Sequence, residues 1–298
     1  LVYAQLLAQQ GARERMLRSW ENEDHGELDW KYDIQPLEIG ASGDLDREYP
    51  GYRCLDFKHQ EIRDGVLAVI KEVVANYPVD GFELRFNYEP YYFHPDEVDA
   101  GRELMTELLG RIYSAVKESG PDRELAVRVP ASLKDCLGAG LDPLEWARRG
   151  IVDVLIPESS ATADPNADFR PFVEAARGTG CRILAGVHSK AETDRIAEAP
   201  VEMVRGLACN YWAQGVDGLY LAHWFEHWPY QTPFYEKLRE LGSPGVMAPK
   251  DKHYRVHVKT GQSPMRQAGA ELPIDLEVGK PVTVELAITD DLPRWHGV

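Results

Sequence analysis

The sequence predicts an α/β fold of the TIM-type (β/α)8 barrel class, followed by a small C-terminal β module. Short apolar segments alternate with amphipathic segments at least five times in a row, which is typical of parallel strands joined by crossover helices. Polar side chains follow one expected strand after another at the carboxyl end, where the loops of a barrel collect functional groups. A chain of 298 residues is long enough for one such domain.

The alternation of strands and helices begins after residue 50. Apolar residues recur at helical spacing between the first two expected strands, as in Ile62, Val66 and Ile70. Gly120 and Gly150 mark helix ends. The expected strands are 52–57, 79–86, 125–130, 152–157, 182–188 and 216–224. The expected helices are 61–77, 96–119, 141–149, 168–177, segments within 190–214, and 233–241.

Two architectures are compatible with this alternation, a doubly wound sheet and an eight-stranded barrel. No glycine-rich phosphate-binding motif follows an expected strand, so we favour a barrel over residues 1–245. Residues 1–51 do not show three further strands, which leaves open that the barrel lacks its first strands in this chain. Residues 246–298 begin with a Gly/Pro linker and then alternate in the β manner, which predicts a partial β-sandwich-like module.

Composition narrows the classes of partner. The formal net charge is −16, which disfavours nucleic acid because an acidic chain repels phosphates. No apolar run reaches the roughly 18 residues of a membrane span. The four cysteines have no metal-binding spacing, and we expect no metal and no cofactor. The N-terminus at Leu1 is not informative about the compartment, and a secreted or periplasmic location is one alternative.

Strand parity places the candidate functional groups. In the strand at 79–86 and the residue after it, Glu83, Arg85 and Asn87 share one face. Three polar groups cannot face an apolar helix layer without a large desolvation cost, so we expect them inside the barrel near its mouth. The same parity directs Arg128 inward on the next strand.

Glu83 and Glu158 are the candidate catalytic residues. Glycoside hydrolysis uses two carboxylates that flank the scissile bond, and Glu158 follows its strand at the carboxyl end. The alternative is that these acids form internal ion pairs with Arg85 or Arg128. The arginines could equally bind an acidic sugar or a sulfate. The expected substrate-binding residues are Arg85, Asn87, Tyr88, Arg128, His188, His223, Trp224 and Trp228.

The segment 223–228 allows two interpretations. His223, Glu226 and His227 match the HxxEH pattern of a zinc peptidase, which would require a helix, whereas here the pattern follows a strand directly. We favour an aromatic sugar-binding rim, with Trp224 and Trp228 offering flat apolar faces. A packed lid is an equally weighted alternative, and a metal-dependent hydrolase using this cluster stays open. Parity does not decide whether His223 or Trp224 points inward.

Several segments together resemble a known family. YRCLDF (52–57), VDGFELRF (79–86), LAVRVP (125–130), GLDPLEWARRGIVDVLIPES (140–159) and GVDGLYLAHW (215–224) resemble, in this order, the family-10-like hypothetical glycosyl hydrolases of environmental bacteria. The resemblance implies a TIM-barrel glycosidase, often with a β-rich C-terminal region, and acids at the ends of the fourth and sixth strands, here Glu83 and Glu158. Arg85 stands where the family has an acid, and His223 where it has an Asn-like residue. These departures leave open a carbohydrate-binding barrel without catalysis.

Overall fold

The computed structural model divides into two compact units. It describes residues 35–88, 90–159, 162–190, 198–224, 229–256 and 274–290. Unit 1 comprises Leu1–Val127 and Cys136–Asp153, and unit 2 comprises Arg128–Asp135 and Val154–Val298.

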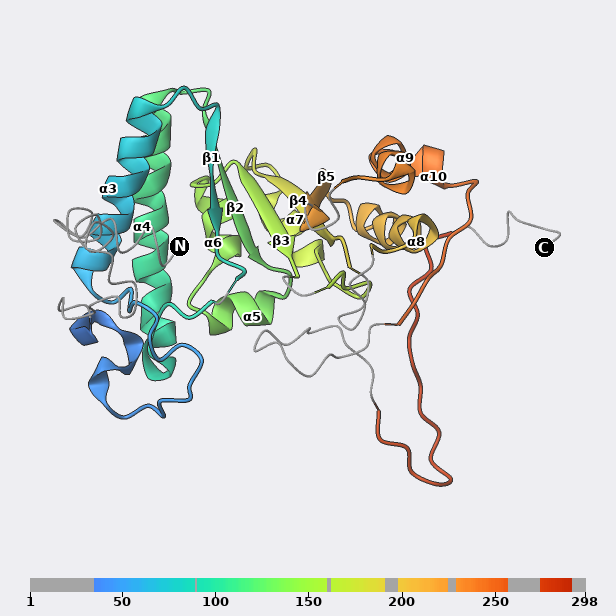
Figure 1. Cartoon of the computed structure of the whole chain (residues 1–298), viewed down its shortest axis with the longest axis horizontal. Helices are drawn as coiled ribbons and strands as arrows, with labels where there is room; N and C mark the ends of the chain where they lie inside the picture. Colours follow the sequence, from blue (N-terminus) through green and yellow to red (C-terminus); the bar gives the residue numbers. More distant parts are fainter. Residues whose placement is uncertain are drawn as a thin grey trace. The chain divides into compact units, whose positions relative to one another are not determined.

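Five strands form one sheet, in which the spatial order is the same as the order in the chain, β1-β2-β3-β4-β5 (Figure 1). They are Gly81–Arg85 (β1), Glu124–Pro130 (β2), Val154–Glu158 (β3), Arg182–His188 (β4) and Gly218–Ala222 (β5). The ladders β3–β4 and β4–β5 are parallel. A doubly wound sheet reverses its strand order at a switch point, whereas this order runs without reversal. The fold is therefore α/β with a singly wound sheet, and among the described residues β1 and β5 end it.

Two long helices of unit 1 pack against each other (Figure 1). They are α3 (Gln60–Asn76) and α4 (Val98–Ser119), preceded by the short helices η1 (Gln35–Leu37), η2 (Ile39–Ser42) and η3 (Pro95–Glu97). Each long helix buries an apolar stripe at helical spacing, as the sequence predicts. Helix α4 ends at Gly120, as expected.

Helix α6 (Pro143–Arg149) of unit 1 has a clear start and stop. The Asp142 carboxylate accepts a hydrogen bond from the Glu145 amide at 3.1 Å, which is an N-cap. Gly150 ends the helix with a φ of 64°, a left-handed conformation that glycine adopts without steric cost. The helix is anchored by Trp146, a fully buried side chain whose indole N–H donates to the Thr106 hydroxyl at 2.9 Å.

Unit 2 contains the whole of β3, β4 and β5 and most of the helices that follow α6. All of β3, and β4 from Ala185 onward, are buried, which explains why their sequences read as apolar runs. Helices α7 and α8 both pack against β4. The helices are α7 (Arg170–Ala176), α8 (Val201–Trp212), α9 (Thr232–Glu240) and α10 (Pro244–Met247), with α5 (Leu133–Gly138) at the boundary between the units.

The strand expected at 52–57 is wrong. The segment makes consecutive turns, in which the Tyr52 amide donates to the Tyr49 carbonyl at 2.9 Å and the Cys54 amide donates to the Gly51 carbonyl at 3.0 Å. Leu55 forms one isolated antiparallel bridge to Glu38. Leu55 and Phe57 are buried, and three backbone hydrogen bonds join the segment to residues 37–40 without forming an assigned strand.

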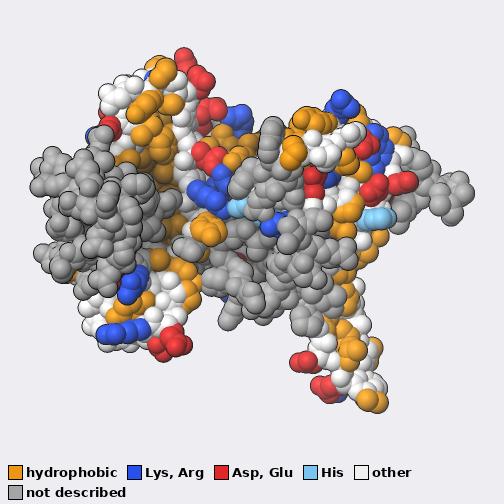
Figure 2. All heavy atoms as spheres, viewed as in Figure 1, with side chains coloured by type: hydrophobic (Ala, Val, Ile, Leu, Met, Phe, Trp, Pro, Cys, Tyr) orange, Lys and Arg blue, Asp and Glu red, His pale blue; other side chains and the backbone are white. Residues whose placement is uncertain are grey.

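The C-terminal β module stays a prediction. The described parts of this region, 246–256 and 274–290, contain no assigned strand. The second part runs as an extended arm (Figure 1), and Figure 2 shows hydrophobic side chains along its surface. One end of the arm is held on α8, because the Asn210 side chain donates to the Ala287 carbonyl at 3.1 Å and accepts from the Thr289 hydroxyl at 3.1 Å.

Among the described residues, no helix is both long and apolar enough to cross a membrane.

Candidate active site

Side chains from successive strands of unit 2 meet toward the carboxyl ends of those strands. Arg128 belongs to β2, Glu158 ends β3, His188 ends β4, Tyr220 belongs to β5, and His223 follows β5 directly. In a parallel sheet the carboxyl ends of neighbouring strands lie at one edge, so residues far apart in the chain come together there. We call these five residues the Glu158 cluster.

Glu158 is at the centre of the cluster and is fully buried. Its Oε2 lies 3.4 Å from Nη1 of Arg128, and its Oε1 lies 3.7 Å from Nε2 of His223. Gly186 makes room for this side chain, because a Cβ at residue 186 would overlap the Cβ and Cγ of Glu158. The guanidinium lies close enough to compensate the charge of a carboxylate that is shielded from water.

Arg128 connects Glu158 to a residue that the sequence analysis missed, Tyr220. Its Nη2 donates to the Tyr220 hydroxyl at 2.6 Å, and its guanidinium carbon lies 4.7 Å from the centre of the Tyr220 ring. The ladder pairs Tyr220 with Gly186, so both residues occupy the same level of the sheet. Leu219 and Leu221 flank Tyr220, and a run of three apolar or aromatic residues gives no parity signal from which its face could be predicted.

The two histidines of the cluster stack on each other. The rings of His188 and His223 are 4.6 Å apart between centroids and inclined by 20°. The Nδ1 of His188 accepts a hydrogen bond from the Lys190 amide at 3.0 Å. A neutral His188 therefore carries its proton on Nε2, and that nitrogen is a hydrogen-bond donor.

The local backbone decides which of His223 and Trp224 joins the cluster. His223 has a φ of 60°, the one positive value among the described non-glycine residues, and its carbonyl accepts from the Ser189 hydroxyl at 2.9 Å. The sharp bend directs the His223 ring to Glu158, while the Trp224 indole donates to the Val187 carbonyl at 3.1 Å. A left-handed histidine at a cluster of polar groups is a strained conformation of the kind found at functional sites.

Trp224 does not offer an exposed face for a sugar. Its side chain is only 4% exposed and packs against Phe234, with the Lys237 ammonium 5.0 Å from its ring centre. Lys237 is also buried and pairs with Glu198, and burial lowers the pKa of the Lys237 ammonium below its usual range. The expectation of a stacking rim at Trp224 is corrected to a packing role against α9.

Four further candidates lie together in unit 1, on β1 and just after it. Glu83 is exposed, whereas Asn87 is fully buried and accepts a hydrogen bond from Nε of Arg85 at 3.1 Å. The Arg85 guanidinium lies 4.9 Å from the ring centre of Tyr88, whose side chain is 58% exposed. The Arg85–Asn87 bond brings two of the three residues expected on one face together, whereas the place of Glu83 beside them stays a prediction. The pairing of Glu83 with Glu158 stays a prediction.

The remaining candidates lie outside the described residues. These are Trp228 of the expected rim, and Glu226 and His227 of the HxxEH pattern. Within the described ranges, no group of three or more His, Cys, Asp or Glu side chains is arranged to hold a metal ion.

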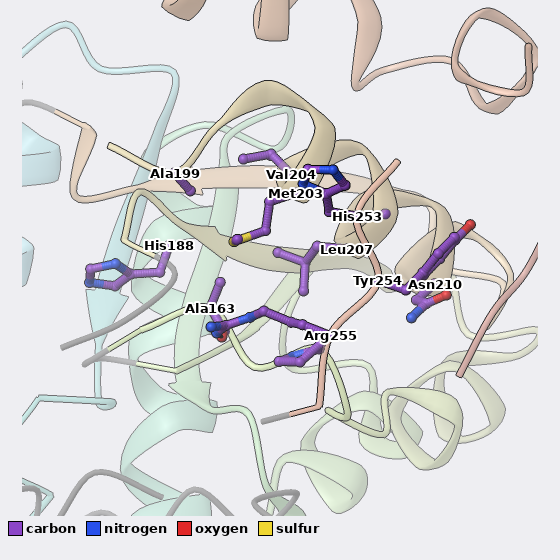
Figure 3. Close-up of a pocket in the computed structure, with 12 residues that line it drawn as sticks. Ala163, His188, Ala199, Met203, Val204, Leu207, Asn210, His253, Tyr254 and Arg255 are labelled. Atoms are coloured by element: carbon purple, nitrogen blue, oxygen red, sulfur yellow. The ribbon is translucent and has the colours of Figure 1, made fainter. Parts of the chain in front are cut away.

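A small pocket lies beside the Glu158 cluster in unit 2 (Figure 3). Met203, Val204 and Leu207 of α8 line it together with Arg255, whose Nη2 donates to the Ala163 carbonyl at 3.0 Å. His188 borders this pocket too, but Figure 3 shows its ring directed away from the α8 side chains. The ring of His188 thus belongs to the Glu158 cluster and not to the apolar pocket.

Comparisons with known proteins do not identify the chain. No family model matches it, and no curated protein matches it. Among solved structures, the chain is similar to the glycoside hydrolase domain of PgaB (BpsB) from Bordetella bronchiseptica, with 13% sequence identity and a TM-score of 0.46 over 67% of each chain. A likeness of this size gives neither an activity nor a substrate, so function has to be argued from the Glu158 cluster.

Proposed function

We propose that this chain is a glycoside hydrolase that acts on a poly- or oligosaccharide at the carboxyl end of a TIM-type barrel. The observation that carries the proposal is the Glu158 carboxylate, which is fully buried at the end of β3 between Arg128 and His223. A buried charge is costly unless it is compensated, so such a carboxylate at the functional edge of a parallel sheet is a strong candidate for chemistry.

The environment of Glu158 suits one of the two carboxylate roles in glycoside hydrolysis. One carboxyl group must donate a proton, and the other must stay ionised as nucleophile or base. Because the Arg128 guanidinium lies 3.4 Å from Oε2 of Glu158 and can compensate a negative charge there, we assign the ionised role to Glu158. For the second carboxylate we retain Glu83, which lies within β1 and is exposed.

The test is turnover of an oligosaccharide panel by the purified chain and three variants. We expect Glu158→Gln and Glu83→Gln each to lower the rate of reducing-end release by roughly 10³-fold, since each removes a group that acts in the transition state. Glu174→Gln is the matched control, because Glu174 is an exposed helix residue whose carboxylate pairs with Arg177. Circular dichroism checks that each variant is folded.

The outcomes separate the alternatives. Full turnover in Glu158→Gln contradicts the assignment of Glu158. If turnover is lost in Glu158→Gln but kept in Glu83→Gln, the assignment of Glu83 as the second carboxylate is wrong and that of Glu158 stands. Binding of oligosaccharides with no product on prolonged incubation of the unmodified chain favours the carbohydrate-binding barrel without catalysis.

A further inference from the structure

Three aromatic side chains are largely exposed among the described residues, Tyr77, Tyr88 and Tyr235. Tyr235 belongs to helix α9, and Tyr77 ends helix α3 before β1 begins. Tyr88 follows the carboxyl end of β1, and the loops after strands are where α/β folds place the groups that bind ligands. Its position in unit 1 therefore distinguishes Tyr88 from the other two.

The loop that carries Tyr88 is closed at its base. The Tyr92 hydroxyl donates to the Phe86 carbonyl at 3.1 Å, so the two ends of the loop are joined. Tyr92 is 4% exposed, and its ring packs edge-on against the rings of Phe57 and Phe86. Asn87, directly before Tyr88, is fully buried. Tyr88 is therefore presented from anchored backbone, which lowers the conformational entropy that is lost when a ligand binds.

Arg85 supports one face of the Tyr88 ring. Its guanidinium carbon lies 4.9 Å from the ring centre, and its Nε donates to the buried Asn87 side chain at 3.1 Å. Tyr88 is nonetheless 58% exposed, so the opposite face and the edge of the ring are open to solvent. An aromatic ring that is supported on one face and open on the other is suited to a flat apolar surface of a ligand.

A pyranose ring has such a surface. Its hydroxyl groups point outward around the ring, whereas its axial C–H groups form an apolar face that leaves water when it stacks on an aromatic ring. The electron-rich face of the tyrosine ring also attracts the partly positive hydrogens of these C–H groups. Neither contact requires a closed cavity. Of the other aromatic residues expected to bind sugar, Trp224 is buried and Trp228 lies outside the described residues.

We infer that Tyr88, with Arg85 behind its ring, is a stacking platform that binds a pyranose ring through its C–H face. The inference rests on the proposed function, which makes the ligand a carbohydrate, and it names the chemistry by which unit 1 binds it. Tyr88 is a binding residue in this assignment and takes no part in the chemical step. Arg85 is a positioning residue, because it acts through the Tyr88 ring.

The test is binding measured by titration calorimetry with linear hexasaccharides of glucose, xylose, mannose and galacturonic acid. The ligand that the unmodified chain binds most tightly is then titrated into the variants. We expect Tyr88→Ala to weaken binding about tenfold and Tyr88→Phe to change it by less than about twofold, because stacking needs the ring and not the hydroxyl. Tyr77→Ala is the matched control with unchanged affinity, since Tyr77 is also 58% exposed and precedes the other end of β1.

Two further measurements separate stacking from a merely structural role. Arg85→Met keeps the Tyr88 ring but removes the guanidinium behind it, and we expect binding to weaken about threefold. In proton NMR of the bound sugar, the ring current of an aromatic side chain moves the C–H resonances upfield. We expect this shift with the unmodified chain and with Tyr88→Phe, and its loss with Tyr88→Ala. Circular dichroism checks that each variant is folded.

Unchanged affinity in Tyr88→Ala overturns the inference, and so does an equal loss in Tyr88→Phe or in Tyr77→Ala. Absence of binding to every hexasaccharide overturns it too. Turnover distinguishes this result from the fate of the proposed function. Binding that depends on Tyr88 without any turnover contradicts the hydrolase and supports this inference. Turnover with the same kcat and KM in Tyr88→Ala supports the hydrolase and contradicts this inference.

Discussion

Glu83 and Glu158 both belong to strands of the α/β repeat, but their surroundings differ. In unit 1, Glu83 is exposed, and the neighbouring Arg85 donates to Asn87 and covers Tyr88. In unit 2, Glu158 is fully buried with Arg128 on one oxygen and His223 near the other. An exposed carboxylate is solvated by water, whereas a buried one depends on its protein neighbours. The electrostatic role of a carboxylate therefore depends on its surroundings and does not follow from residue type and strand position alone.

The largest expected difference between the units concerns their arginines. Arg128→Met leaves the Glu158 charge buried without its guanidinium, and we expect a loss of about 3–5 kcal/mol in the free energy of unfolding. Arg85→Met removes a half-buried contact to Asn87, and we expect a loss of about 1 kcal/mol. Urea unfolding measures both. Equal losses in the two variants would contradict the view that Arg128 compensates a buried charge whereas Arg85 makes an ordinary hydrogen bond.

The next effect concerns ion pairs away from the Glu158 cluster. In unit 2, Glu240 is buried, and the hydrogen bond from Arg205 at 2.6 Å holds the pKa of its carboxyl below the ordinary value. The stabilisation is therefore present above the unfolded-state pKa of about 4.3 and is lost as the pH falls through the lower folded-state value. We expect Glu240→Gln to cost about 1.5–3 kcal/mol at neutral pH and to flatten the fall in stability below about pH 4.5.

The matched pair in unit 1 is Asp64 with Arg111, at 2.6 Å between Oδ1 and Nη2. The hydrogen bond from Arg111 lowers the pKa of Asp64 too, but both side chains are almost half exposed. Salt screens exposed charges far more than buried ones. We expect Asp64→Asn to change acid unfolding little, and that change to vanish in high salt. A larger acid effect in Asp64→Asn than in Glu240→Gln would reverse the comparison.

The sequence predicted the strands better than the site. The five strands that form the sheet follow from apolar segments separated by helical periodicity, and burial on both faces preserves that signal in β3 and β4. The segment 52–57 has a similar composition, but it forms turns and a short backbone pairing with residues 37–40, since local apolar content does not distinguish such a loop from a strand of the sheet.

The Glu158 cluster depends on features with weaker sequence signals. Arg128 and Glu158 could be placed by parity, but Tyr220 lies between two leucines that hide its face. The choice between His223 and Trp224 depends on a positive φ at a non-glycine residue, which residue type alone does not indicate. The space above Gly186 is visible only once β3 and β4 are paired.

Gly186 gives a third way to compare the units. A Cβ in Gly186→Ala would overlap the side chain of Glu158, and we expect a loss of about 1–3 kcal/mol from overpacking together with displacement of the carboxylate. Gly110 of α4 in unit 1 has open space around its Cβ position, so Gly110→Ala should stabilise the protein by about 0.5–1 kcal/mol. Thermal unfolding measures both signs. Two changes of the same sign would contradict the packing assigned to Gly186.

The smallest expected difference concerns two tyrosines. Tyr220→Phe removes the hydroxyl that accepts from Arg128 at 2.6 Å but keeps the ring beneath the guanidinium, and we expect a loss of about 0.5–1.5 kcal/mol. Tyr88→Phe in unit 1 changes an exposed side chain and keeps its ring beside Arg85. We therefore expect the free energy of unfolding to change by no more than about 0.5 kcal/mol. The combined variant Tyr220→Phe with Arg128→Met sharpens the test. If Tyr220 acts through Arg128, the loss of stability in the double variant should be smaller than the sum of the losses in the two single variants. Full additivity would mean that the hydroxyl stabilises unit 2 independently of the guanidinium, and the Glu158 cluster would then lose Tyr220 as a member.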